Sequence, residues 1–220
     1  MQQKIVNNNI IILNSEAANP SLEDVSKVEL KIATIYETLN PKPVITRFPD
    51  FTAILIPEVQ VSIIIEKSRT IISDQNIGDS DRRDMLKFIQ LVKGIVDILG
   101  RPTKGYGYNF SYEAENSNFN HFKDSLATKF IKPNARYNLP SDSVLEYILP
   151  TLVFKHGTSK YTIKFNPILT NPVSTEESKR LLIKCHVRYT DETIPNIENL
   201  YQDYKSVREY LDNYIITLFG

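Results

Sequence analysis

The feature that most constrains the fold is a change of hydrophobic period between residues 59 and 99. Apolar side chains first recur at every second position, as on one face of a strand, at Val59, Val61, Ile63 and Ile65. A reversal at residues 67–68 leads into a second short run, residues 69–75. The spacing then becomes helical, with Met85, Phe88, Val92, Ile95 and Leu99 on one stripe, and "GRP" ends the helix. The segment is predicted to fold as strand, strand and helix, followed by another strand.

The C-terminal part of the chain repeats this order. Residues 151–165 have the pattern of a hairpin with its turn at 156–159, and "KRLLIKCHVRY" alternates as a further strand. A helix of about six turns follows, and its apolar stripe consists of Ile197, Leu200, Tyr204, Val207, Leu211, Tyr214 and Leu218. Strand sets that are each followed by a helix predict an α+β fold, with a mainly antiparallel sheet and helices packed on one face. We expect a single compact unit over residues 1–220, and the order leaves open two similar strand-strand-helix halves, 1–135 and 136–220.

The remaining segments give weaker patterns. "NIIILN" and "KVELKIATIYE" (residues 27–37) are interpreted as strands, and "NPKPVITRFPD" as a connection broken by prolines. Residues 116–131 are predicted to form a shorter helix. The packing of the first fifty residues is left open.

Composition excludes several classes of protein. Lys+Arg and Asp+Glu both total 26, so no net field attracts nucleic acid or an anionic membrane, and such a partner would need a local patch. A single cysteine excludes an internal disulfide framework. The longest apolar runs are too short to cross a bilayer, and the N-terminus lacks the pattern of a signal peptide. We therefore expect a cytoplasmic protein with no membrane partner.

Two short motifs suggest ligand chemistry but have simpler structural explanations. Gly105-x-Gly107 resembles a phosphate-binding loop, yet such a loop runs from a strand into a helix, and here a helix precedes the glycines and a strand follows them. Asp79-x-Asp81 stands immediately before a predicted helix, where aspartate caps free backbone N–H groups. We expect neither a cofactor nor a metal at these positions.

Catalytic residues are equally hard to assign. Cys185 and His186 are adjacent on a predicted strand, so their side chains point to opposite faces and cannot act as nucleophile and base. His121 and His156 are isolated in the sequence, and no second cysteine supports a zinc site. An enzyme would require a cleft assembled from remote carboxylates such as Asp74, Asp79 and Glu113.

A charge pattern is the strongest functional signal. Between residues 155 and 188 there are seven Lys or Arg against two acidic residues. The candidate binding residues alternate away from the apolar face of two strands and are Lys160, Lys164, Lys184, His186 and Arg188. If these strands are neighbours, one sheet face carries a basic patch suited to an anion or a nucleic acid. The aromatic residues of the same strands fall on the opposite face, so base stacking there is not expected. A solvated face, or one covered by a partner, is the alternative interpretation.

These observations lead to three functional hypotheses. The first is a non-enzymatic protein-interaction module, such as a subunit, an adaptor or an immunity-like binder, with a protein partner or a second copy of the chain. The second is a nucleic-acid or anion binder that uses the basic face, and the third is an enzyme with a cleft that the sequence does not reveal. The stripe of the last helix could form a dimer seam, although two tyrosines on it favour packing on its own sheet.

The order of elements also resembles a family of sporadically distributed, uncharacterised bacterial proteins. The similarity lies in the paired strands "VQVSIIIEKSRTIISDQ", the helix that follows them, the strand "YGYNFSYE", and "LLIKCHVRY" with the terminal helix. It covers residues 55–115 and 180–220 and implies an α+β fold without a known chemistry.

Overall fold

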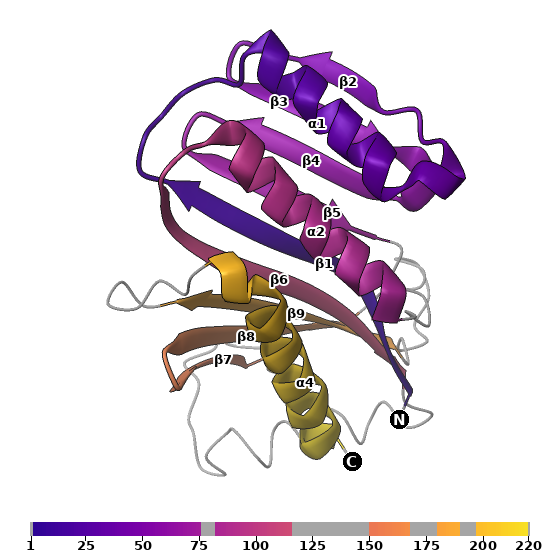
Figure 1. Cartoon of the computed structure of the whole chain (residues 1–220). Helices are drawn as coiled ribbons and strands as arrows, with labels where there is room; N and C mark the ends of the chain where they lie inside the picture. Colours follow the sequence, from indigo (N-terminus) through magenta and orange to yellow (C-terminus); the bar gives the residue numbers. More distant parts are fainter. Residues whose placement is uncertain (1, 76–81, 116–149, 168–179, 190–196, 220) are drawn as a thin grey trace, which may run out of the picture.

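The protein is built on one nine-stranded sheet with helices on one of its faces (Figure 1). The computed structural model describes residues 2–75, 82–115, 150–167, 180–189 and 197–219. The strand order is β2-β3-β4-β5-β1-β6-β9-β8-β7, and all neighbouring strands are antiparallel. The predicted α+β fold, with a mainly antiparallel sheet, is confirmed. The division into halves at residue 135 stays a prediction.

The strands are β1 (Gln2–Asn14), β2 (Val44–Arg47), β3 (Phe51–Ile56), β4 (Val61–Glu66), β5 (Arg69–Asp74), β6 (Thr103–Glu115), β7 (Thr151–His156), β8 (Ser159–Pro167) and β9 (Arg180–Tyr189). The described helices are α1 (Leu22–Ile35), α2 (Arg82–Leu99) and α4 (Leu200–Phe219), with short 3₁₀ turns at Glu37–Leu39, Pro57–Val59 and Ile197–Asn199. The predicted helix at 116–131 lies outside the described residues. Val59 and Ile197, which were expected to lie in a strand and a helix, lie in 3₁₀ turns instead.

The two longest strands, β1 and β6, form the middle of the sheet. Each has 13 residues, and they pair side by side, with Asn9 directly opposite Asn109. The hairpins follow outward from this pair, β5 to β2 on one side and β9 to β7 on the other. The sheet therefore consists of two groups of strands that meet along β1 and β6.

The structure corrects two predictions. Residues 44–47, inside the predicted connection, form strand β2, and most of the segment 27–37 belongs to helix α1 and not to a strand. Ser21 caps the helix: its hydroxyl accepts a bond from the Asp24 N–H at 3.0 Å, and its own N–H donates to the Asp24 carboxylate at 2.8 Å. These bonds lower the pKa of Asp24. Val25, Val28 and Ile32 follow at helical spacing and are buried. A capping box followed by apolar residues three and four apart defines a helix start, and this signal outweighs the short apolar alternation.

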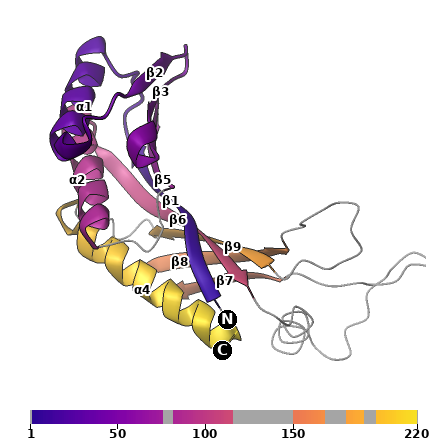
Figure 2. The same ribbon diagram turned by 90° about the vertical axis from the view of Figure 1, so that its right-hand side faces the viewer.

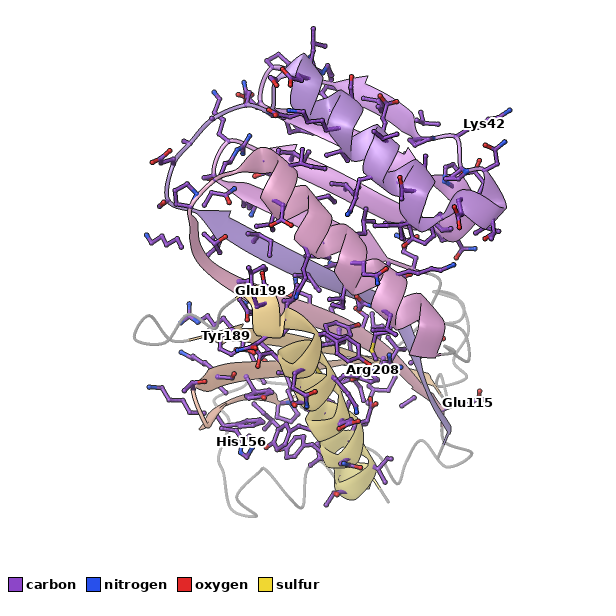
Figure 3. All side chains as sticks on the ribbon, viewed as in Figure 1. Lys42, Glu115, His156, Tyr189, Glu198 and Arg208 are labelled. Atoms are coloured by element: carbon purple, nitrogen blue, oxygen red, sulfur yellow. The ribbon has the colours of Figure 1, made fainter. Side chains whose placement is uncertain are left out.

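The main core lies between the sheet and helices α2 and α4. Gly100 ends α2 with a φ of +59°, a left-handed conformation that favours glycine. Tyr204 of α4 is 1% exposed, and its ring centroid lies 5.6 Å from that of Tyr108 on β6 and 6.3 Å from that of Phe88 on α2. Figure 3 shows Arg208 on the side of α4 that faces α2. The apolar stripe of α4 is thus buried within the chain, as expected for a helix that packs on its own sheet.

The sheet is twisted and bent, and its two faces differ. Figure 2 shows α1, α2 and α4 following one another along the outer side of the bend. None of the helices in the described ranges lies on the inner side, which we call the open face. Because successive residues of a strand point to opposite faces, every second side chain of the nine strands lies on the open face.

Candidate functional site

The open face carries a group of basic side chains at its β7–β8–β9 end, which we call the basic half. Its members are Lys155, Lys160, Lys164, Lys184, His186 and Arg188. The strand registers bring the five sequence candidates together on this one face and add Lys155 from β7. The side chains that alternate with them, such as Tyr161 and Val187, are buried on the helix side. Alternation between core and surface positions therefore gathers the charges.

Like charges face one another across the strands of the basic half. Lys160 pairs in register with Lys155 on one side and Arg188 on the other. Lys164 and Lys184 form a second row of facing cations. This row lies four residues along the strands from the first, a separation of about 13 Å. Like charges directly opposite each other destabilise a sheet. Within the described ranges, neither the four lysines nor Arg188 forms an ion pair. We therefore expect the arrangement to lower the stability of the free protein, and it suits an anionic ligand.

A row of uncharged polar residues crosses the middle of the open face. It runs in register from β4 to β8 through Ser62, Ser73, Asn9, Asn109, His186 and Thr162. The Nδ1 of His186 contacts the Oδ1 of Asn109 within hydrogen-bonding distance. The alternation within "NNNIIILN" places Asn7 and Asn9 on the face of Ile11, but no charge pattern or catalytic motif in the sequence marks these asparagines. Amide and hydroxyl groups of this kind can hydrogen-bond to the sugars and base edges of a nucleic acid.

The other end of the open face, formed by β2 to β5 with part of β1, is apolar, and we call it the apolar half. Its members are Ile11, Leu13, Val44, Phe51, Ala53, Leu55, Ile64 and Ile71. Val44 and Leu55 are 52% and 48% exposed. Among the described open-face residues of β2 to β5, the charged ones are Glu66 and Arg69, and they bind each other through two hydrogen bonds of 2.6 and 2.9 Å. Phe51 also stacks on Phe48 at the end of this half.

Gly107 marks the junction of the two halves. It lies on β6 between Ile11 of β1 and Arg188 of β9. A side chain at this position would place its Cβ 2.7 Å from the backbone oxygen of Val187, so only glycine allows β6 and β9 to approach this closely. Gly105 faces open space. The two glycines thus form part of a strand and not a phosphate-binding loop between a strand and a helix.

The structure does not bring the alternative catalytic candidates together. Asp74 lies on the helix side of the sheet, because it follows Ser73, whereas Glu113 lies on the open face. Asp79 lies outside the described residues. Cys185 is 2% exposed, and burial raises the pKa of its thiol to about 12, which keeps it protonated. His186 points to the opposite face. In the described part of the chain, no cluster of three or more His, Cys, Asp and Glu residues could hold a metal ion.

Several tyrosines packed under the helices also have perturbed pKa values. The Tyr106 hydroxyl donates a 2.8 Å hydrogen bond to the Asp203 carboxylate of α4, and burial raises the pKa of Tyr106. Burial likewise raises the pKa of Tyr189 to about 12. Figure 3 shows Tyr189 beside the start of α4. These tyrosines lie between sheet and helix, where their neutral forms are favoured, and we assign them a structural role.

Comparison with known proteins identifies no family. No protein-family model matches the chain, and no curated protein matches it. Among solved structures, Methanococcus jannaschii TBP matches with a TM-score of 0.30 and 14% identity, over 97% of this chain and 99% of that chain. A TM-score of this size supports no conclusion about function, and the resemblance to an uncharacterised bacterial family stays a prediction. Of the described helices, none has the length and hydrophobicity needed to span a bilayer.

Proposed function

We propose that this protein binds a nucleic acid across the open face of its sheet. The observation that carries the proposal is the set of cross-strand cation pairs in the basic half, which includes Lys155–Lys160 and Lys164–Lys184. Such pairs lower the stability of the free protein, and a bound polyanion would remove the repulsion. Departures from the usual rules of sheet pairing occur most often at functional sites.

The surroundings of the cations favour a nucleic acid over a simple anion. Phosphates would contact the lysines and Arg188, whereas Asn109 and Thr162 in the neighbouring row offer donors and acceptors to sugars and bases. The two cation rows, about 13 Å apart, would contact more than one phosphate of a chain. The neutral overall composition fits this view, because the positive charge is concentrated on one half of one face.

The test is a pair of charge reversals, Lys184→Glu and Arg188→Glu, each compared with Lys42→Glu. Lys42 is exposed in the connection before β2, far from the basic half, as Figure 3 shows, and its reversal changes the net charge equally. Binding of fluorescent DNA and RNA, single- and double-stranded, is measured by anisotropy between about 50 and 200 mM salt. We expect each open-face variant to bind about tenfold more weakly with a shallower salt slope, and Lys42→Glu to bind as the unaltered protein does.

The apolar half supports a second candidate, a protein partner or a second copy of the chain. Leu13, Val44 and Leu55 are between 44% and 52% exposed, and such residues are commonly covered at protein interfaces. This is the protein-interaction hypothesis of the sequence analysis. A protein that binds none of the four nucleic acids, yet forms a dimer in sedimentation experiments that Leu55→Asp disrupts, would favour this candidate over the first.

A further inference from the structure

His186 lies at the centre of the basic half and is surrounded by cations. Lys184 and Arg188 flank it two residues away on β9, and on β8 its partner Thr162 lies between Lys160 and Lys164. On β6 it faces Asn109, which stands between Gly107 and Ser111. The carboxylates on the open face of β6 are Glu113 and Glu115, which lie four and six residues beyond Asn109, and the nearer one is about 13 Å away along the strand. The charged groups around the imidazole are therefore mainly positive.

In this structure Asn109 turns its amide oxygen toward the ring, and this orientation assigns the proton to Nδ1. An amide oxygen accepts hydrogen bonds and cannot donate them, so Nδ1 of His186 donates to Oδ1 of Asn109. In the neutral ring Nε2 then has a lone pair and no hydrogen. Phosphate oxygens are acceptors, so a bond from Nε2 to a phosphate forms only when the ring takes up a second proton.

Building on the proposed function, we propose that nucleic-acid binding is coupled to protonation of His186. A phosphate held among the lysines and Arg188 favours the imidazolium, which donates to Asn109 from Nδ1 and to the phosphate from Nε2. The complex therefore takes up one proton, and affinity increases as the pH falls.

The free protein favours the neutral ring. Partial desolvation of the ring by its neighbours on the sheet, and after it the charge of Arg188, lowers the pKa of His186 below its usual value of 6.5. Without a ligand, the unfolded chain therefore takes up this proton at a higher pH than the folded protein does. The contribution of His186 to folding stability consequently falls as the pH drops below 6.5. A bound phosphate has the opposite effect, because its negative charge favours the imidazolium. Folding stability and binding affinity should thus change in opposite directions with pH.

The experiment measures the Kd of a mixed-sequence DNA duplex between about pH 5.5 and 8 for the unaltered protein, His186→Gln, His186→Lys and His156→Gln. We expect the unaltered protein and His156→Gln to bind about three- to tenfold more tightly at the acidic end. His186→Gln should lose this dependence, and His186→Lys should bind tightly throughout. Circular dichroism checks that each variant is folded. The ring-proton NMR signal of His186, titrated with and without duplex, should show a higher pKa in the complex.

The outcomes separate this inference from the proposed function. Salt-dependent binding with the same pH profile in His186→Gln as in the unaltered protein, or a His186 signal whose pKa is unchanged by duplex, would overturn the proton linkage and leave nucleic-acid binding in place. The absence of salt-dependent binding at every pH would overturn both. Loss of the pH dependence in His186→Gln alone would establish the linkage.

Discussion

The two halves of the open face have the same backbone architecture and opposite chemistry. In the apolar half, aliphatic residues such as Ile64 and Ile71 pair across the strands, and the charged residues Glu66 and Arg69 neutralise each other. In the basic half, cations such as Lys164 and Lys184 pair across the strands instead. The helix faces of both halves are apolar and share one core. The fold therefore depends on the helix face of the sheet. The residues of the open face can differ between the halves, and they are available to contact a ligand.

The comparison also shows which contacts join the halves. On the helix side Tyr204 of α4 reaches Phe110 of β6, with ring centroids 5.5 Å apart, and Phe88 of α2. On the open face the strand pair β1–β6 joins them through Asn9 and Asn109. The halves thus share a core and differ in their exposed surface. Substitutions in the core and substitutions on the exposed surface can test this distinction separately.

The largest expected effect is on the shared core. Tyr204→Ala removes a ring that is 1% exposed and should lower the free energy of unfolding by about 3–5 kcal/mol, as for other buried aromatic residues. Urea denaturation followed by circular dichroism measures it, with Ile216→Ala, 51% exposed on the same helix, as the control. We expect one transition in every variant. Two separate transitions would mean that the halves fold independently and that their common core has little effect.

A smaller effect is expected from the apolar half. Leu55→Ser should weaken nucleic-acid binding about fivefold, because roughly 1 kcal/mol of apolar contact would be lost, and it should leave the salt slope unchanged. Leu30→Ser, on the exposed side of α1, is the matched control and should bind normally. Equal affinities for the two variants would restrict the ligand to the basic half.

The smallest effect is on the stability of the free protein. Lys184→Gln removes the repulsion with Lys164 and should raise the free energy of unfolding by about 0.2–1 kcal/mol, while it weakens nucleic-acid binding. Thermal and chemical denaturation of this variant, of Lys42→Gln and of the unaltered protein measures the difference. A loss of stability in Lys184→Gln would contradict the view that the cation pairs are unfavourable without a ligand.

Much of the fold could be predicted from local periodicity. Period-two runs located the β4–β5 and β7–β8 hairpins, β6 and β9, and the helical stripes located α2 and α4. Residues 27–37 were misassigned because a short run such as "VELKIATI" fits both periods, and the deciding signal was the cap at Ser21 and Asp24, outside the run. Local sequence is therefore sufficient where a pattern is long and ambiguous where it is short.

The candidate site was predicted only in part, for a related reason. The alternation of Lys184, His186 and Arg188 along one strand placed these residues on a common face without knowledge of the fold. The polar row was not foreseen, because Asn9 and Asn109 are 100 positions apart and only the β1–β6 register brings them together. No local pattern contains that information.

The sequence by itself determined the faces of the strands and helices, the concentration of positive charge in the C-terminal part, and the α+β class. These properties follow from side-chain spacing, which a helix or a strand converts directly into direction. Only the tertiary structure decided the strand order, the position of His186 among four cations beside Asn109, and the division of the open face into two halves. Strand neighbours are selected by the packing of a shared core, which depends on residues from the whole chain.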